Sequence, residues 1–412
     1  MNYKVKIDVI SFFMWLFLLL QVKFFWLVPG NLFYSVNSNQ QQFLMILILL
    51  VSYFVFRWRP LFYGTGSVKA FIIFFLIYYF FELTYSVFRN RQGFLNAFIA
   101  SNFYLFILFY FYVLFFLIKR GVEKFYRIII TVSSINVFIC WLQYFTAKLG
   151  FIFTRIDTSS YRFGTVRIGA LSETVTSFGL IICFNYFLEN KRNRWFYFLI
   201  FLIGFLGNIF VSKGRISILA LTVGCLFSII LKYRKHILKI ILVTILFSGL
   251  VLSFSMSSIG KTYLNSFENT ETDTGSVRAR ELDYYNNQTK NSPIFGVGFI
   301  RDINDTASVF LKGPTHQYSR TDIGIFGLAN SMGVISVIWY IMLTINLFTK
   351  IIFVKNRNDN DRYNSIIAYM MYSIICIPTM IFLNPFSITS EAILMGVIDY
   401  YYLEGKQKSK NV

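Results

Sequence analysis

The chain has 412 residues, 56% of them hydrophobic and 20% aromatic, and its mean hydropathy is +0.59. A soluble domain cannot bury that much apolar surface, so the composition excludes a soluble protein and indicates an integral membrane protein. The formal net charge is +20. Since Lys and Arg gather in the cytoplasmic loops of membrane proteins, this charge indicates loop asymmetry rather than nucleic-acid binding.

Apolar runs divide the chain into twelve expected spans. The first run lacks a small-residue cleavage site, which favours a first span over a cleaved signal peptide. No internal repeat is visible, so the expected fold is an all-α polytopic membrane protein with one integral membrane domain, 1–412. The expected spans are 9–28, 42–56, 70–88, 94–118, 128–147, 170–187, 195–211, 216–231, 240–257, 323–347, 363–383 and 389–403.

The distribution of Lys and Arg predicts the orientation of these spans. The loops on the side of the termini hold 23 of these residues, and those on the other side hold 15. Seven of the 15 lie in the long polar loop 258–322, which the positive-inside rule does not count. Both termini are therefore predicted to be cytoplasmic and loop 258–322 extracytoplasmic, although Arg89 and Arg91 lie on the disfavoured side.

The four cysteines are expected to be small core residues. Cys140, Cys183, Cys225 and Cys376 all lie inside apolar runs, far from one another in the sequence. They show neither the spacing of metal ligands nor that of a disulfide framework.

Several cations lie on the predicted outer side, where the positive-inside bias disfavours them. An anion at the outer leaflet, such as a polyprenyl diphosphate, would explain them, because guanidinium groups bind phosphate oxygens bidentately. The alternative is that long basic side chains at span ends reach toward lipid phosphates. These residues are Arg162, Arg167, Lys213, Arg215, Arg278, Arg280 and Arg320.

Other polar residues on this side are candidates for chemistry or for structure. His316 follows Gly313-Pro314, and a neutral imidazole there could accept a proton from a sugar hydroxyl; the alternative is a solvated loop histidine. Glu173 begins the span 170–187, and Glu82 lies inside span 70–88, where a carboxylate is costly. Asp322 is expected to cap the span that follows it.

The glycines of this region are expected to serve the backbone. Gly296 and Gly298 are expected in a turn, and Gly324 and Gly327 where helices approach closely.

Four short elements, placed in order over about 165–335, resemble the O-antigen ligase and Wzy-type polysaccharide polymerase superfamily. Two departures are Gln317, where Asn is common, and Thr174-Val175 after Glu173, where the family pattern has Pro-Asn. The elements are Arg167-Ile168-Gly169 with Glu173, Ser212-Lys213-Gly214-Arg215, Arg278 or Arg280 with Ser292-Pro293-Ile294-Phe295-Gly296-Val297-Gly298, and Thr315-His316-Gln317 with Gly324-Ile325-Phe326-Gly327.

The resemblance implies a membrane glycosyltransferase on a GT-C-like fold of about twelve helices, with its active site in loop 258–322 between the ninth and tenth. The reaction is expected to be inverting and independent of metals and cofactors. His316, Arg215, Arg278 and Arg280 would be catalytic. Arg167, Arg162, Lys213, Glu173 and Arg320 would bind substrate.

The resemblance also implies partners and a location. The donor would be an oligosaccharide repeat unit on undecaprenyl diphosphate in a bacterial inner (plasma) membrane. Membrane lipid, a flippase and a chain-length regulator are expected partners, and nucleic acid is not.

Three functions remain open in the sequence. A polymerase of O-antigen, capsular or exopolysaccharide is preferred because the chain is rich in Phe, Asn and Lys. A ligase would use the same donor and differ in the acceptor. A flippase or exporter should carry charges in the membrane midplane and show internal repetition, and few such charges are expected here. A purely structural membrane protein would not need His316 and the arginines.

Overall fold

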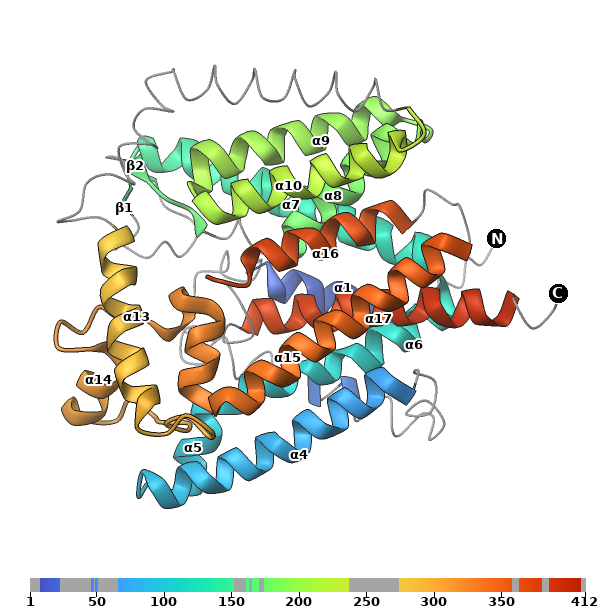
Figure 1. Cartoon of the computed structure of the whole chain (residues 1–412). Helices are drawn as coiled ribbons and strands as arrows, with labels where there is room; N and C mark the ends of the chain where they lie inside the picture. The colour runs from blue at the N-terminus through green and yellow to red at the C-terminus, as the bar shows by residue number, and fades with distance from the viewer. Residues whose placement is uncertain are drawn as a thin grey trace, which may run out of the picture.

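The computed structural model describes residues 8–22, 46–47, 49–50, 66–151, 161–162, 165–169, 174–236, 274–357, 363–379 and 385–408. These residues form a bundle of long helices and one short pair of strands (Figure 1). The elements are α1 (Val9–Gln21), α4 (Gly66–Arg89), α5 (Phe94–Ser101), η3 (Asn102–Leu108), α6 (Phe109–Arg120), α7 (Val122–Lys148), β1 (Tyr161–Arg162), β2 (Thr165–Val166), α8 (Thr174–Leu188), α9 (Arg194–Gly207), η5 (Asn208–Ser212), α10 (Arg215–Tyr233), α13 (Thr274–Lys290), α14 (Asp305–Lys312), η6 (Arg320–Ile323), α15 (Gly324–Arg357), α16 (Asn364–Cys376) and α17 (Pro385–Lys408).

Within the described ranges, six helical stretches are long and apolar enough to cross a membrane. They contain α4, the run from α5 to α6, α7, α9 with η5, α10, and η6 with most of α15. α1, α8 and α16 are shorter apolar helices. These nine elements coincide with nine of the twelve expected spans. Two others, 42–56 and 240–257, lie largely or wholly outside the described residues, so the count of twelve stays a prediction.

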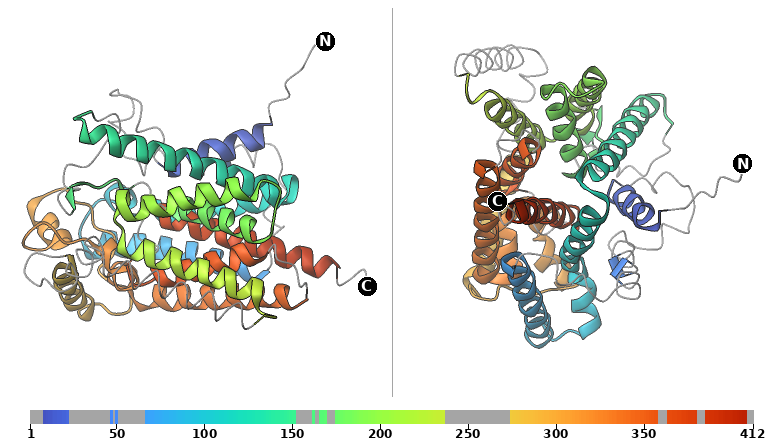
Figure 2. Two further views of the ribbon diagram at one scale, coloured as in Figure 1. Left: turned by 90° about the horizontal axis from the view of Figure 1, so that it is seen from above. Right: turned by 90° about the vertical axis from the view of Figure 1, so that its right-hand side faces the viewer.

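The remaining expected span, 389–403, lies in α17, which is not among the apolar candidates. α17 lies in the middle of the bundle, as the view along its axis shows (Figure 2, right). Most of its residues from Ile388 to Tyr401 are buried, and it packs against α6, α15, α16, α8 and η3. A helix enclosed by protein does not need an apolar surface, because its polar groups can find partners on its neighbours.

α17 also corrects the expectation that the chain has few buried charges. Asp399 is fully buried, forms an ion pair with Lys350 of α15 at 2.8 Å, and accepts a hydrogen bond from the Tyr110 hydroxyl at 2.6 Å. Glu391 is also buried and accepts a hydrogen bond from the Tyr340 hydroxyl at 3.3 Å. These charges have partners inside the protein, so they do not by themselves indicate a transport path.

The turns of the bundle gather at two opposite ends. Asp8, before α1, lies 2.7 Å from both Arg120 and Lys124, at the turn between α6 and α7. The Tyr126 hydroxyl lies 3.3 Å from the Tyr401 hydroxyl, which places the end of α17 near the same turn. The strands, the η5–α10 turn, α13 and α14 lie at the other end (left in Figure 1 and in the left view of Figure 2). This end is the predicted outer side; its orientation relative to the cytoplasm stays a prediction.

Candidate active site

A break in α15 at Gly333 organises the predicted outer end. Gly333 has φ 71° and ψ −178°, so the helix changes direction there (Figure 1). The amide of Val334 donates to Pro293 O at 2.9 Å instead of to a helical carbonyl. The carbonyl of Asn330 accepts from the Val297 amide at 2.7 Å. The loop 293–298 therefore satisfies the backbone groups that the break exposes.

The glycines of this loop are required by close backbone contact. A Cβ on Gly296 would lie 2.5 Å from Asn330 O, and a Cβ on Gly333 would lie 1.9 Å from Ile294 O. Both residues also have positive φ. The expected turn at Gly296 and Gly298 is confirmed, since both have positive φ. Glycine is required at Gly296 also because the loop packs directly against the backbone at the break. Gly324 is likewise a site of close approach, because its Cβ would lie 2.2 Å from Ile377 O.

The end of α4 and the start of α5 hold the other side of this loop. Ser86 Oγ accepts a hydrogen bond from the Phe299 amide at 2.7 Å, and Asn90 Nδ2 donates to Val297 O at 3.0 Å. Arg301 Nη1 donates to Asn96 Oδ1 at 2.8 Å. The loop is thus fixed between α4–α5 and the break in α15.

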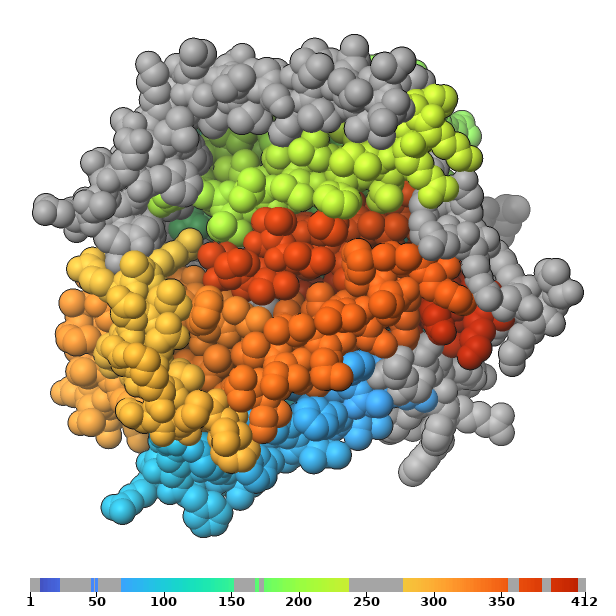
Figure 3. Space-filling view, in the orientation of Figure 1, coloured from blue at the N-terminus to red at the C-terminus, as the bar shows by residue number. Residues whose placement is uncertain are grey.

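α13 and α14 form a cap over this end of the bundle (Figure 3, left). The last carbonyls of α14 have no donors within that helix, and side chains of α13 donate hydrogen bonds to them. Tyr284 Oη donates to Val309 O at 3.0 Å, Tyr285 Oη to Leu311 O at 2.5 Å, and Gln288 Nε2 to Phe310 O at 2.9 Å. Asn330 Nδ2 donates to Tyr285 O at 3.0 Å, which joins the cap to α15.

Arg278 and Glu281 lie on α13, which packs against η6, and Arg320 is the first residue of η6. We call these three residues the arginine–glutamate cluster. Glu281 is 1% exposed, and its Oε1 accepts from the Ser319 amide at 3.0 Å. Its Oε2, Arg278 Nε, and Nε and Nη2 of Arg320 are buried, with no hydrogen bond in the described part of the chain. The guanidinium of Arg320 lies 5.9 Å from the centre of the Tyr285 ring. Within the described part, the cluster thus holds both buried N–H donors and a buried carboxylate oxygen without hydrogen-bond partners.

The charge of Glu281 is sensitive to pH near neutrality. Burial raises the pKa of Glu281 to about 7. The hydrogen bond from Ser319 opposes this rise, Asp322 adds to it, and Arg278 opposes it. The expected cap by Asp322 is wrong, because its exposed carboxylate makes no hydrogen bond in the described part and α15 begins instead at Gly324 with φ 49°.

A second group of predicted residues meets at the junction between α9 and α10, and we call Arg167, Lys213 and Arg215 the junction cluster. Arg167 Nε donates to Ser212 O at 2.8 Å, and the Ile168 amide donates to Val211 O at 3.0 Å. The π-helical η5 leads into Lys213, which has φ 53° and is 5% exposed. Arg215 is the first residue of α10, where the helix dipole favours an anion.

His316 lies in a tight turn after α14 and is exposed, with φ 54°. Its Nδ1 lies 3.2 Å from Ser308 Oγ. Asp302, beside it, pairs with Lys312 at 2.5 Å, and this hydrogen bond lowers the pKa of Asp302. The turn itself is anchored, because Tyr318 fills the space beside Gly313 and stacks edge-on against Tyr284 at 5.5 Å.

The predicted site residues lie in three groups in the structure, and their convergence into one site stays a prediction. Arg167 contacts the 212–215 junction, Arg278 and Arg320 lie on the neighbouring elements α13 and η6, and His316 has its own network on α14. Arg280 is exposed, two residues from Arg278 and so on a different face of α13. Only the backbone of Arg162 is described, in β1, and Glu173 lies outside the described residues.

Residues 197–341 match the family model described as O-antigen ligase. The match confirms the resemblance to the O-antigen ligase and Wzy-type polymerase superfamily. It contains Lys213, Arg215, the arginine–glutamate cluster, the loop 293–298 and His316. Arg162, Arg167 and Glu173 precede the O-antigen ligase match. No curated protein matches the chain.

The structure adds residues to which no sequence pattern assigned a clear role. Glu281 lies within the O-antigen ligase match, three residues after Arg278. This spacing places the two side chains on one helix face, so it could have identified Glu281 as a neighbour of Arg278. Glu82 of α4 is fully buried, and neither carboxylate oxygen makes a hydrogen bond in the described part. The neighbouring Tyr78 hydroxyl donates to Met332 O instead.

Proposed function

We propose that the protein transfers a glycan from a polyprenyl diphosphate to a sugar hydroxyl at the outer face of a bacterial inner membrane. The observation that carries the proposal is that buried guanidinium nitrogens, Nε of Arg278 and Nε and Nη2 of Arg320, make no hydrogen bond in the described part. The O-antigen ligase match and the apolar helices support a membrane enzyme of the ligase or polymerase type.

In this proposal the arginine–glutamate cluster holds the diphosphate of the donor. Two guanidinium groups in a partly buried site bind phosphate oxygens more strongly than they would in water. As the bond between the sugar and the diphosphate breaks, its electron pair moves to the phosphate oxygen. Arg278 and Arg320 stabilise that negative charge, so the reaction needs neither a metal nor a strong acid.

His316 acts on the acceptor. Its Nδ1 is held near Ser308 Oγ, which leaves Nε2 for a proton from the acceptor hydroxyl. The hydroxyl oxygen forms the new bond to the anomeric carbon on the face opposite the leaving diphosphate, which inverts the configuration there.

The junction cluster contributes a second positively charged surface. Arg215 and Lys213 would bind phosphate or glycan beside the N-terminus of α10. Arg167 already donates to Ser212 O, so its role is to position the junction. Arg162 and Glu173 remain proposed substrate-binding residues on sequence alone, and Arg280 becomes the less favoured of the two α13 arginines.

The product is proposed to be a polysaccharide chain built from repeat units. The description of the matched family favours the second candidate, a ligase that transfers the glycan to a different acceptor. Both candidates share the donor chemistry described above.

The test is transfer by the purified protein in nanodiscs, with a lipid-diphosphate-linked repeat unit as the donor. We expect a polymer ladder from the native protein, its loss in Arg278→Gln and His316→Ala, and its retention in the matched control Arg280→Gln. Product on a foreign acceptor without a ladder would mean a ligase. Movement of the labelled donor across a vesicle membrane without a new glycosidic bond would mean a flippase and would overturn the proposal.

A further inference from the structure

A polar group surrounds the imidazole of His316 at the exposed edge of the cap. Its Nδ1 lies 3.2 Å from Ser308 Oγ, and Lys312, four residues along the same face of α14, lies 2.5 Å from Asp302 Oδ2. Lys312 is the main cause of the lowered pKa of Asp302. The Ser308 hydroxyl and the His316 imidazole lower that pKa further, so the carboxylate lies beside both groups.

The backbone of the turn 313–318 brings His316 back against α14. The Tyr318 amide donates to Lys312 O at 2.8 Å, and the His316 amide donates to Gly313 O at 3.1 Å. His316 has φ 54°, a conformation that residues other than glycine adopt rarely and that is enriched at functional sites. The strained turn thus places one imidazole against one hydroxyl, which is expected where the orientation of the ring matters.

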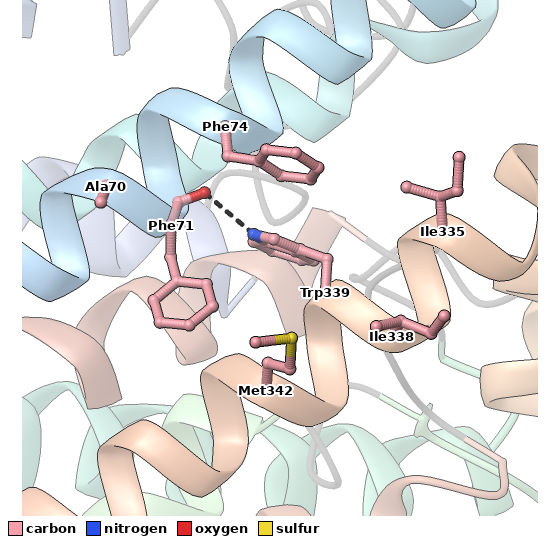
Figure 4. Close-up of a pocket in the computed structure, with 7 residues that line it drawn as sticks. All are labelled: Ala70, Phe71, Phe74, Ile335, Ile338, Trp339 and Met342. Carbon is pink, nitrogen blue, oxygen red and sulfur yellow. Dashed lines mark hydrogen bonds between the residues drawn. The ribbon is translucent and has the colours of Figure 1, made fainter.

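The two sides of this polar group are attached to one frame of helices. Arg301, next to Asp302, donates to a side chain of α5 at 2.8 Å. On the other side, hydrogen bonds fix α14, which carries Ser308, to α13, and fix α13 to α15. α15 is in turn joined to α4, because Trp339 Nε1 donates to Phe71 O at 2.9 Å (Figure 4). The carboxylate and the hydroxyl are therefore held in place from two directions.

The single proton of the Ser308 hydroxyl decides which way the hydrogen bonds run. An ionised carboxylate can only accept, so this proton goes to Asp302. Lys312 binds Oδ2 of the carboxylate and leaves Oδ1 for the hydroxyl. The oxygen of Ser308 then accepts from Nδ1–H of His316, and a neutral imidazole with its proton on Nδ1 has its free lone pair on Nε2.

We propose that Ser308 and Asp302 are positioning residues that hold His316 as the Nδ1–H tautomer, with Nε2 as the base. The inference rests on the proposed function, in which Nε2 takes the proton of the acceptor hydroxyl. The hydroxyl oxygen bonds to the anomeric carbon as the diphosphate leaves with the electron pair of the broken bond. The imidazolium keeps Nδ1–H on Ser308 and loses the new proton to solvent, because His316 is exposed. Asp302 stays ionised and stabilises the imidazolium.

The tautomer can be measured without any transfer reaction. The sequence has two histidines, so His236→Gln leaves His316 as the one imidazole for ¹⁵N NMR of ring-labelled protein in nanodiscs. At about pH 8.5, where an ordinary imidazole is neutral, we expect a protonated Nδ1 and an unprotonated Nε2. Ser308→Ala and Asp302→Ala should shift the population toward the Nε2–H form, and Ser308→Thr should keep the native signals. A native protein in the Nε2–H form, or a tautomer that Ser308→Ala leaves unchanged, would overturn the proposal.

Transfer kinetics show whether the tautomer matters for the reaction. With the lipid-diphosphate-linked donor, Ser308→Ala should lower kcat about ten- to a hundredfold and leave the KM for the donor nearly unchanged. The matched control is Thr306→Ala, which removes a hydroxyl from an exposed position of α14 and should keep the native kcat. If Ser308→Ala changes the tautomer but not kcat, the positioning role is wrong. If the tautomer shifts as expected but the native protein transfers glycan from no donor, the proposed function fails and the control of the tautomer stands.

Discussion

The amide of Val334 and the carbonyl of Pro293 lie 2.9 Å apart, so a residue on one side of a helix break is paired with the loop that fills it. The geometry leaves no room for a side chain at the break. It determines where the cap of α13 and α14 lies relative to the membrane-spanning part of α15.

Replacement of Gly333 by Ala should therefore destabilise the protein severely. A Cβ there would lie 1.9 Å from Ile294 O, and the residue has φ 71°. We expect a loss of about 2–4 kcal/mol in the free energy of unfolding, because backbone strain adds to displacement of the loop. Thermal unfolding in detergent measures it. Gly93→Ala is the control, since a Cβ at Gly93 meets nothing within 4 Å; equal stability of the two variants would contradict the argument.

The titration of Glu281 predicts a pH dependence. Its pKa is raised from 4.5 to about 7, so the folded state favours the protonated form. Glu281 then contributes stability that is fully present below pH 4.5 and is lost as the pH rises through about 7. Its ionised carboxylate, facing Arg278 and near Asp322, also competes with a bound anion. Affinity for inorganic diphosphate should fall between pH 6 and 8.

Glu281→Gln tests this origin of the pH effect. The variant carries no titrating carboxyl, so its diphosphate affinity should vary less between pH 6 and 8 than that of the native protein. Isothermal titration calorimetry of both proteins, in buffers of equal ionic strength, provides the comparison. Parallel pH profiles would mean that another group controls binding.

The hydroxyl of Tyr285 should contribute to the stability of the cap. It is buried and donates to Leu311 O at 2.5 Å, so Tyr285→Phe leaves that carbonyl without this donor. We expect a cost of about 1–3 kcal/mol. Faster hydrogen exchange at α14 amides, measured by mass spectrometry, should localise it. Tyr318→Phe is the control, because its ring packs on Tyr284 while its hydroxyl makes no hydrogen bond in the described part.

The Lys350–Asp399 pair should show strong coupling. Asp399→Asn leaves the ammonium of Lys350 in the bundle without its counter-ion, and we expect a loss of about 3–5 kcal/mol. The double variant Lys350→Met with Asp399→Asn should lose less than the single variant, because it removes the uncompensated charge. Chemical unfolding of these two variants and of the single variant Lys350→Met closes the double-mutant cycle. Additive losses would show that the two groups do not interact.

The membrane-spanning fold could be predicted from the sequence to a large extent, because long apolar runs are the direct signature of lipid exposure. The bounds of α4, α7 and α10 differ from the expected spans by only a few residues at most ends. The buried position of α17 in the middle of the bundle could not be predicted from apolar runs. Glu391 and Asp399 look costly in an apolar run until the structure shows Tyr340 and Lys350 beside them.

Individual motifs of the candidate site could be predicted from the sequence, but the contacts between distant segments could not. The order of Arg167 and the 212–215 junction indicated one site, and the structure joins them through Arg167 Nε and Ser212 O. The grouping of Arg278 with Arg320 depends on how α13 packs against η6, where Glu281 Oε1 accepts from the Ser319 amide 38 positions further along the chain. Local spacing carries no information on such a contact. Arg278 is half-buried and Arg280 is exposed, and this difference is a property of the folded chain.

The central position of α17 has a consequence for how the chain is made. An acidic residue in the middle of an inserting helix costs about 2.5–3.5 kcal/mol, so a segment with Glu391 and Asp399 would insert poorly by itself. Tyr110, Tyr340 and Lys350, which bind these two carboxylates, all precede it in the chain and leave the ribosome first. α17 therefore enters a membrane in which its partners are already in place, and truncation before α17 would remove the carboxylate that pairs with Lys350.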